Sequence, residues 1–525
     1  MKKILKTIFN NGAKTFFRNK NFANRNEQNN ILADILERNS NVDQIKPLQE
    51  DILKTLEDPE NLYENFSELE LNNYASIKKD IEKMMQGEEN ILTENQLLSF
   101  IKAGGTTSAG PGKFLPFTKE SLEQNHSKAG KTLVHNYVSS HPECKIFMGQ
   151  SLALTGGKQE ETQSAYISYL LHSYGFPKIL NYLKAPSQET NNIKNRDEKI
   201  DNLIKETIDS DIRSISGVPS QLLTLFRKVL NQYNKEYIDE IRPNCEVIFG
   251  GGTKVSLYKK DLLSLFKKDK KPEIIEVYNA SEGFFATENN NQLELLVNHG
   301  VFYEFLPKQY YNKDLNKINK NKILTLRKAS LSNEELVMII TTQGGLYRYI
   351  LGDTIRFLHP ELNSPNKFPI EITGRLEAYC DVFNEHMIVS YTDQAIEKTL
   401  KETGNQLKEY TIAPIFSTIN QPGSYECCIE FTNTPINLEK FATIFDTELQ
   451  KTNDNYKAKR ENGSMSSPTI KILHPGTFEL FHEKRENLHA QSKVLRLAND
   501  RKIIEELVIA IGKDKRNTLP NYQSS

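Results

Sequence analysis

Apolar residues in the first part of the chain recur three or four positions apart, which is the spacing of an amphipathic helix. Leu32, Ile35 and Leu36 form one such set. The pattern predicts a helical N-terminal segment over residues 1–98. Its first stretch, Met1 to Phe22, is basic and faintly amphipathic, and no small-residue cleavage site follows it. We therefore expect a surface helix there and not a signal peptide.

Farther along the chain, short apolar runs alternate with helical patterns. Strands are predicted at residues 144–154, 246–249, 273–277, 293–297, 301–305 and 335–341. Helices are predicted at residues 119–138, 220–233 and 258–267. Several predicted strands end in glycine or polar residues, as at Gly250-Gly251-Gly252. This alternation is typical of an α/β core, in which ligands gather at the strand ends.

The pattern changes after about Phe383, where it predicts a smaller unit. Helical spacing is found at residues 391–403, 438–451 and 501–511, and a strand pattern at residues 424–431. A chain of 525 residues also exceeds what one hydrophobic core usually supports. We therefore expect a large N-terminal domain over residues 1–385 and a small α+β domain over residues 386–525.

Charge and composition narrow the classes of partner. The chain carries 67 Lys and Arg against 68 Asp and Glu, a net charge of −1, whereas nucleic-acid-binding proteins usually have a basic excess. No apolar run approaches the roughly 18 residues of a membrane span. We expect no nucleic-acid partner and no stable membrane insertion, and the oligomeric state stays open.

The cysteines indicate a reducing compartment. There are five, an odd number, and none has C-x-x-C spacing, so neither a disulfide framework nor a zinc site is expected. Scattered single thiols are typical of a reducing environment, and we expect a cytoplasmic protein.

One loop has unusual chemistry, because residues 104–118 read GGTTSAGPGKFLPFT. Up to Lys113 it combines glycines and hydroxyl side chains with one lysine. Glycine lets backbone amides approach a ligand closely, and successive N–H groups form an anion-binding concavity. The Walker pattern does not fit, because Pro111 stands where the lysine would follow Gly105 and Gly110. The loop has the chemistry to hold a triphosphate, although a flexible Gly/Ser loop has a similar sequence.

Two further segments carry polar residues suited to a nucleotide. Glu282, after a predicted strand, is a candidate magnesium ligand, because Mg²⁺ takes a few carboxylates plus substrate oxygens. Tyr278 offers a flat face for a purine. Asp353, which we place after a glycine turn, is a candidate acceptor for paired ribose hydroxyls. The alternatives are an ordinary surface Glu, and an Asp that caps a helix or a turn.

Two basic residues complete the candidates. Arg375, near the change of domain, either meets a phosphate bidentately or pairs with a surface acid. Lys493 lies in a polar loop of the small domain, from which it would neutralise developing negative charge in a cleft, although most loop lysines are solvated surface. No Ser-His-Asp triad is legible among the scattered histidines.

Several blocks, in sequence order, resemble one family. They are residues 87–93 (GEENILT), 106–116 (TTSAGPGKFLP), 248–252 (IFGGG), 278–283 (YNASEG), 298–307 (NHGVFYEFLP), 345–353 (GLYRYILGD) and 493–501 (KVLRLANDR). Together they look like blocks of the acyl-acid amido synthetases first known from auxin-responsive plant genes, the Gretchen Hagen family, and especially of its bacterial relatives. The resemblance covers most of residues 65–510.

The resemblance implies the fold of adenylate-forming enzymes, with a large N-terminal domain and a small mobile C-terminal domain. It also implies the reaction. A small carboxylic acid attacks the α-phosphorus of ATP and displaces pyrophosphate, and an amine, usually of an amino acid, then attacks the acyl-adenylate and displaces AMP. ATP and Mg²⁺ are the implied nucleotide and metal.

The matching blocks also imply roles for single residues. Tyr278 and Ser281 would lie at the nucleotide, together with Thr106, Thr107 and Ser108, which would contact its phosphates. The other implied roles are Mg²⁺ binding for Glu282, ribose binding for Asp353, and an approach to the active site from the small domain for Lys493.

The chain departs from the family at two places. Gly104 and Gly105 replace two serines that commonly begin the phosphate loop, and His386 stands where a lysine often follows an acid near the hinge. Two alternatives stay open: a ligase that forms a thioester with coenzyme A, and a catalytically silent nucleotide-binding protein, which these departures suggest.

Overall fold

The computed structural model describes most of the chain. Its described residues are 2–19, 28–46, 59–103, 113–155, 164–174, 178–193, 195–252, 255–358, 367–376, 379–380, 382, 385, 387–416, 422–433, 437–461, 463–484, 494–512 and 521–523.

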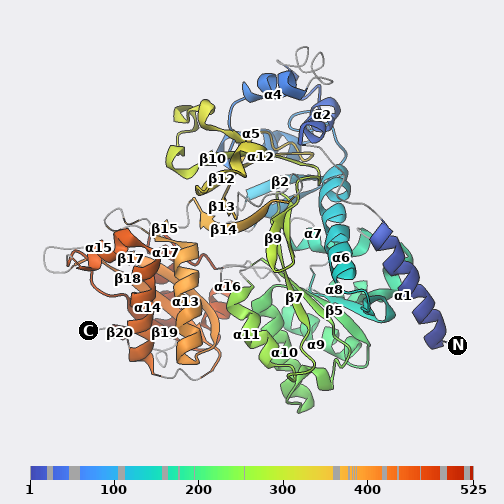
Figure 1. Ribbon diagram of the computed structural model, residues 1–525, viewed down its shortest axis with the longest axis vertical. Helices are drawn as coiled ribbons and strands as arrows, with labels where there is room; N and C mark the ends of the chain where they lie inside the picture. The colour runs from blue at the N-terminus through green and yellow to red at the C-terminus, as the bar shows by residue number, and fades with distance from the viewer. Residues whose placement is uncertain are drawn as a thin grey trace.

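The N-terminal segment is helical, as its apolar spacing predicts. It contains α1 (Lys2–Asn19), α2 (Gln28–Arg38), α4 (Pro59–Ser67) and α5 (Tyr74–Met85), coloured in blue shades in Figure 1. Leu32, Ile35 and Leu36 are buried on α2, and α1 packs against the body of the protein through the buried Phe17. The segment ends slightly earlier than residue 98, because strand β1 (Leu97–Ala103) begins at Leu97.

The phosphate-type loop connects two strands of a hairpin. Strand β1 pairs antiparallel with β2 (Lys113–Thr118), and Ala103 lies opposite Lys113. Residues 104–112 lie outside the described residues. Lys113 therefore begins a strand, at the point where the sequence pattern ended the turn.

A single large sheet forms the backbone of the N-terminal lobe. Its order is β11-β10-β12-β13-β14-β9-β8-β7-β6-β5-β3-β4. In that order the strands are Leu324–Thr325, Val301–Pro307, Leu336–Thr342, Tyr349–Phe357, Pro369–Arg375, Gln292–Leu295, Phe284–Asn289, Glu273–Asn279, Val247–Gly251, Ile212–Gly217, Gln150–Ala153 and Lys184–Ala185. The predicted strands at 246–249, 273–277, 301–305 and 335–341 are confirmed to within one residue at each start as parts of this sheet, and the one at 293–297 is confirmed as far as Leu295.

The sheet changes character between β7 and β8. Neighbouring strands from β4 to β7 are parallel, whereas β7 to β8, β8 to β9 and the strands beyond them are antiparallel. Figure 1 shows the parallel part low in the N-terminal lobe and the antiparallel part above it, with β7 and β9 between. The turn that carries Ser281 and Glu282 joins the two parts.

Helices cover the sheet and connect its strands. They are α6 (Lys128–Ser140), α7 (Ser164–Tyr174), α8 (Gln188–Asn191), α9 (Arg196–Thr207), α10 (Pro219–Tyr233), α11 (Ser256–Ser264) and α12 (Leu326–Ala329). A π-helix, Ser121–Ser127, leads into α6, and short 3₁₀ helices lie at Ile146–Met148, Lys178–Leu183, Ile238–Glu240, Lys308–Tyr310, Leu315–Lys317 and Lys320–Lys322.

One predicted strand is wrong over half its length. The apolar run at residues 144–154 predicts extended backbone, but Ile146–Met148 forms a 3₁₀ helix and only Gln150–Ala153 is a strand. Ile146 and Phe147 are buried in the cluster that also holds Phe17 of α1. Tertiary packing therefore uses these apolar residues in a helical turn, although the same residues would suit a buried strand.

The C-terminal lobe is a separate α+β unit, drawn in orange and red in Figure 1. Its sheet has the order β17-β18-β19-β20, formed by Leu407–Ile415, Ser424–Phe431, Thr469–Leu473 and Asn521–Gln523. Its helices are α13 (Val389–Thr403), α14 (Leu438–Thr452), α15 (Asp454–Glu461), α16 (Thr477–Lys484) and α17 (Lys502–Gly512). Cys427 packs with residues of α13 and α14 and Cys428 with residues of α16 and α17, as the alternation of a strand with two covered faces requires.

A small hairpin leads from one lobe into the other. It consists of β15 (Tyr379–Cys380) and β16 (Met387–Ile388). The expected domain boundary between residues 385 and 386 falls inside this hairpin. Cys380 and Met387 are both fully buried in the core cluster that includes the C-terminal lobe.

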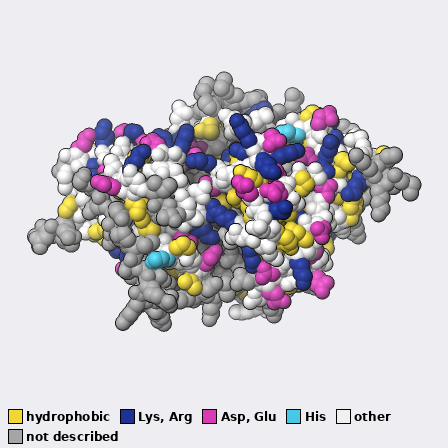
Figure 2. Space-filling view, turned by 90° about the horizontal axis from the view of Figure 1, so that it is seen from below, with side chains coloured by type: hydrophobic (Ala, Val, Ile, Leu, Met, Phe, Trp, Pro, Cys, Tyr) yellow, Lys and Arg dark blue, Asp and Glu magenta, His cyan; other side chains and the backbone are white. Residues whose placement is uncertain are grey.

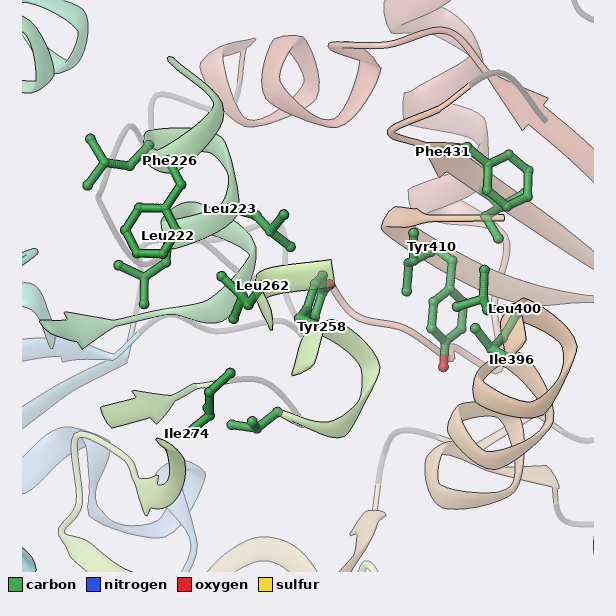
Figure 3. Close-up of a cluster of buried hydrophobic side chains, with 14 of the residues drawn as sticks. Leu222, Leu223, Phe226, Tyr258, Leu262, Ile274, Ile396, Leu400, Tyr410 and Phe431 are labelled. Carbon is green, nitrogen blue, oxygen red and sulfur yellow. The ribbon is translucent and has the colours of Figure 1, made fainter. Parts of the chain in front are cut away.

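One apolar cluster continues from lobe to lobe. Leu222, Leu223 and Phe226 of α10 and Leu262 of α11 face side chains of α13, β17 and β18 across Tyr258 (Figure 3). Tyr258 is fully buried. The lobes therefore share a packed apolar interface.

The surface carries charges of both signs, and the thiols lie in the interior. Figure 2 shows Lys and Arg side chains interspersed with Asp and Glu on the face it presents. All five cysteines are free and buried. Within the described residues, no helix combines the length and the apolar character needed to cross a membrane.

Candidate functional site

Asp353 lies in the middle of a strand, which corrects its expected placement in a turn or at a helix cap. The motif places it after a glycine turn, with a helix cap or turn as the alternative, but it belongs to β13. Gly352 next to it has φ +89, a conformation that favours glycine. The sequence motif thus marks a local distortion of a strand, and not the end of one.

Arg375 faces Asp353 across the sheet. The two residues are directly opposite in the antiparallel pair of β13 and β14, and the Nε of Arg375 donates to Oδ1 of Asp353 at 2.6 Å. The Arg375 side chain is 46% exposed and that of Asp353 is 5% exposed. The arginine therefore does pair with an acid, but the acid is buried and the guanidinium keeps an open side.

Tyr278 contacts the same carboxylate from β7. Its hydroxyl donates to the other oxygen of Asp353, Oδ2, at 2.5 Å. Burial raises the pKa of Tyr278 well above its ordinary value, and the nearby Asp353 charge raises it further. The ring packs in the apolar core beside Phe285, with the ring centroids 5.3 Å apart. Tyr278 thus anchors Asp353 and belongs to the core.

Glu282 joins this group from the turn between β7 and β8. The turn is closed by hydrogen bonds between the backbones of Ala280 and Gly283 in both directions, at 2.8 and 3.3 Å, and it carries Ser281 and Glu282 at its centre. Burial raises the pKa of Glu282; the Arg375 charge lowers it, Asp353 raises it and Lys113 lowers it. Glu282 is therefore within electrostatic reach of all three.

Lys113 brings the β1–β2 hairpin to the same place. Its Nζ lies 5.7 Å from the centre of the Tyr74 ring, and the Tyr74 hydroxyl accepts a hydrogen bond from the N–H of Phe114 at 3.0 Å. The strand that begins directly after the phosphate-type loop is thus held by α5 beside Glu282.

The residues present fit a magnesium ion that is bound together with phosphate. Within the described part of the chain, the Glu282 carboxylate makes no ion pair, and no group of three or more His, Cys, Asp or Glu is arranged to hold a metal. One free carboxylate suits Mg²⁺, which prefers few protein ligands plus phosphate and water oxygens.

The structure brings together Tyr278, Ser281, Glu282, Asp353 and Arg375 from segments that are up to about a hundred positions apart in the sequence. The other candidates, Thr106, Thr107, Ser108 and Lys493, lie outside the described residues, as do Gly104, Gly105 and His386.

Sequence reasoning missed three residues of this region. Tyr74 holds the start of β2, and Tyr349 is close enough to Glu282 for that charge to raise its pKa, after the larger effect of burial. Asn125, in the π-helix, binds the backbone directly after the Glu282 turn. The signal available for Asn125 was an asparagine inside a predicted helix, where this residue is unfavourable.

Comparison with models of protein families shows to which family the chain belongs. Three family models match in order: the GH3 family N-terminal domain at residues 14–242, the central domain at 294–375 and the C-terminal domain at 390–502. The chain belongs to the GH3 family. Its three matched regions contain Asn125, Asp353, Arg375 and Arg496.

Relatives and solved structures agree with this membership. The chain is 24% identical over 524 residues to the indole-3-acetic acid-amido synthetase GH3.4 of Arabidopsis thaliana, covering 86% of this chain and 85% of that protein. The fold is similar to that of the GH3.15 acyl acid amido synthetase, with a TM-score of 0.72, 15% identity and coverage of 95% and 94%. It is also similar to a 2-hydroxyisobutyryl-CoA ligase in the postadenylation state, with a TM-score of 0.57, 11% identity and coverage of 93% and 92%. The chain therefore has the adenylate-forming fold, with a large N-terminal and a smaller C-terminal domain.

Proposed function

We propose that this protein is an ATP-dependent acyl-acid amido synthetase of the cytoplasm. A carboxylate oxygen of the acid attacks the α-phosphorus of ATP, and pyrophosphate leaves. The amine of an amino acid then attacks the acyl carbon, AMP leaves with the bridging oxygen, and the nitrogen loses a proton. The observation that carries the proposal is the convergence of Glu282 with Asp353 and Arg375 in a chain of the GH3 family.

The described residues have separate tasks in this proposal. Asp353 accepts hydrogen bonds from the ribose hydroxyls, and Arg375 and Tyr278 hold its carboxylate in place. The exposed side of the Arg375 guanidinium is available to a phosphate oxygen. Ser281 lies next to the nucleotide. Such chemistry needs the protein mainly for positioning and for charge stabilisation.

Glu282 would hold the magnesium ion. When bound, Mg²⁺ would neutralise phosphate charge and help the pyrophosphate to leave. The raised pKa of Glu282, which burial causes, would return toward its ordinary value because the nearby cation favours the charged carboxylate.

The remaining roles rest on sequence blocks alone. Thr106, Thr107 and Ser108 would bind the phosphates. The small domain would rotate about a boundary near residues 385 and 386, and its Lys493 would stabilise the developing negative charge. The five free cysteines support a reducing compartment.

Thioester formation with coenzyme A is the weaker candidate. The likeness to the CoA ligase is a likeness of fold, with a TM-score of 0.57 and 11% identity, whereas the family models that match most of the chain are those of the GH3 family. The catalytically silent alternative rests on Gly104, Gly105 and His386.

A panel experiment tests the proposal. Purified protein is incubated with ATP, Mg²⁺ and a set of carboxylic acids, with either amino acids or coenzyme A as acceptor, and the products are identified by mass spectrometry. We expect an acyl-amino acid and AMP from at least one acid, and a large loss of both with Glu282→Gln. A thioester without an amide would favour the CoA ligase, and ATP binding without pyrophosphate exchange on any acid would favour the silent protein.

A further inference from the structure

The π-helix at Ser121–Ser127 aims one side chain at the turn that carries Glu282. Asn125 is 4% exposed, and its Oδ1 accepts a hydrogen bond from the N–H of Phe284 at 2.7 Å. Its Nδ2 donates to the carbonyl of the same residue at 3.0 Å. Phe284 begins β8 and stands two positions after Glu282.

The amide of Asn125 binds the backbone of Phe284 as a neighbouring strand would. Phe284 lies opposite Asn279 of β7, and the pairing of β7 with β8 shifts register between Tyr278 and Asn279, next to the turn. A primary amide presents a donor and an acceptor in one plane, which matches the N–H and C=O of an extended residue. The two polar groups of Phe284 are thereby satisfied in a buried position, where unpaired groups would be costly.

Asn125 also ties the turn to a second segment. Its Nδ2 donates to the carbonyl of His299 at 2.8 Å, and the His299 ring is held by Thr132 of α6 at 2.8 Å. Burial lowers the pKa of His299 to about 3, so this ring is neutral near pH 7. One side chain therefore joins the π-helix, the start of β8 and the segment before β10.

There is little room for the turn to move. A Cβ built on Gly283 would lie 2.7 Å from the Phe285 ring and 3.4 Å from Oδ1 of Asn125. A π-helix inserts an extra residue into a helical turn and is frequent at functional sites, and here that insertion contains Asn125.

We propose that Asn125 is a positioning residue for magnesium-dependent nucleotide binding. It clamps the backbone after the turn, so that the Glu282 carboxylate is fixed where the metal of a metal–nucleotide complex is taken up. Asn125 itself touches neither metal nor nucleotide. The inference rests on the proposed function, because it assigns magnesium to Glu282.

The test compares ATP affinity with Mg²⁺ and with EDTA, measured by calorimetry without any acid substrate. The ratio of the two affinities is the magnesium contribution. With Asn125→Ala we expect this ratio to fall about tenfold, which corresponds to about 1.4 kcal/mol, while the affinity in EDTA stays within about twofold. Asn125→Asp keeps the acceptor for the Phe284 N–H but sets a carboxylate oxygen against the carbonyls of Phe284 and His299, so a fall of at least similar size is expected; it is the second variant if the alanine variant does not fold.

Asn136→Ala is the matched control. Asn136 lies on α6 and donates to Oγ1 of Thr287 at 3.4 Å, so it contacts the same β8 strand farther from the turn. We expect a lower melting temperature at most, with an unchanged magnesium contribution. An unchanged contribution in both Asn125 variants, or an equal fall in Asn136→Ala, would overturn the inference.

Glu282→Gln distinguishes a failure of the positioning role of Asn125 from a failure of the magnesium assignment to Glu282. If this variant loses the magnesium contribution and the Asn125 variants keep it, the inference fails and the metal assignment stands. If Glu282→Gln itself keeps the full contribution, the metal assignment in the proposed function is wrong, and the inference falls with it.

Discussion

At the scale of single residues, the site is organised around the Asp353 carboxylate. One of its oxygens accepts from Arg375 and the other from Tyr278, so each oxygen is oriented by a donor from a neighbouring segment. A carboxylate held from two sides loses little further freedom when a ligand binds, which is the advantage of a preorganised site.

Replacing this carboxylate by an amide should weaken nucleotide binding. For Asp353→Asn we expect ATP affinity to fall about 10- to 100-fold, because hydrogen bonds to a charged acceptor contribute about 1.5–3 kcal/mol. The measurement is ATP binding by calorimetry, with Asp314→Asn as control, since Asp314 forms an exposed ion pair with Lys317. Unchanged affinity in Asp353→Asn would remove Asp353 from the nucleotide site.

At the scale of elements, spacing predicted helices such as α10, α13 and α14 and the strands β6, β7, β10, β12 and β18, but it did not single out β5, β8, β14, β17 or β19. At two places where an element was expected to end or to be extended, a neighbouring element decides. Residues 146–148 turn into a 3₁₀ helix under α1, and Asp353 remains inside β13 because Arg375 of β14 continues the ladder opposite it.

Helix α11 carries a buried acid that destabilises it at neutral pH. Asp261 is 6% exposed, and burial raises its pKa to about 6, an effect that Arg227 and Lys260 partly offset. A carboxyl group with a raised folded-state pKa contributes stability that is present below its unfolded-state pKa and is lost as the pH rises through the folded-state value.

Asp261→Asn should therefore stabilise the protein at pH 8 by about 1–3 kcal/mol, since a tenfold change in an ionisation equilibrium corresponds to about 1.36 kcal/mol. The gain should shrink as the pH falls through 6 and vanish near pH 4. Urea unfolding at several pH values measures it. Asp201→Asn is the control, because Asp201 forms an exposed pair with Lys228 of α10 and should change stability by less than about 0.5 kcal/mol. A gain that does not depend on pH would contradict this account.

At the scale of the whole molecule, Arg496 and Tyr258 join the two lobes. Arg496 of the C-terminal lobe donates to the Tyr258 hydroxyl at 3.2 Å, and that hydroxyl donates to the carbonyl of Lys408 at 3.3 Å. Arg496 also pairs with Asp393 at 3.2 Å and with Glu409 at 3.5 Å. A tyrosine of α11 thus contacts a charged and aromatic group of residues in the other lobe.

Tyr258→Phe should loosen the lobes while keeping the apolar packing. Both lost hydrogen bonds cross between the lobes, so we expect a loss of about 1–2 kcal/mol and a larger radius of gyration by small-angle X-ray scattering. Tyr410→Phe is the control, because the Tyr410 ring also flanks Arg496, at 5.4 Å, but its hydroxyl binds Asp393 within the C-terminal lobe. A radius that grows equally in both variants would contradict a specific role for Tyr258.

Much of the fold and part of the site followed from sequence, because they depend on local signals. The period of apolar residues predicted the elements around Leu32, Phe249 and Cys427. The polar residues after β7 singled out Tyr278 and Glu282, and the block around Gly352 singled out Asp353. Ordered blocks such as YNASEG indicated the family that the three domain models confirmed.

Local signals do not encode which distant residues meet. The register of β13 against β14 placed Arg375 opposite Asp353, and the course of the π-helix placed Asn125 against Phe284. The members of each pair lie too far apart in the sequence for the period of apolar residues to show that they meet.

By itself, the sequence determined many of the longer helices, some of the strands, the family and the candidate chemistry, because backbone preference and burial of one face act over a few residues. Only the tertiary structure decided that Asp353 is buried between two donors, that Asn125 anchors the Glu282 turn, and that Tyr258 enters the second lobe. Those contacts depend on strand register and on packing between elements, which form only when the whole chain has folded.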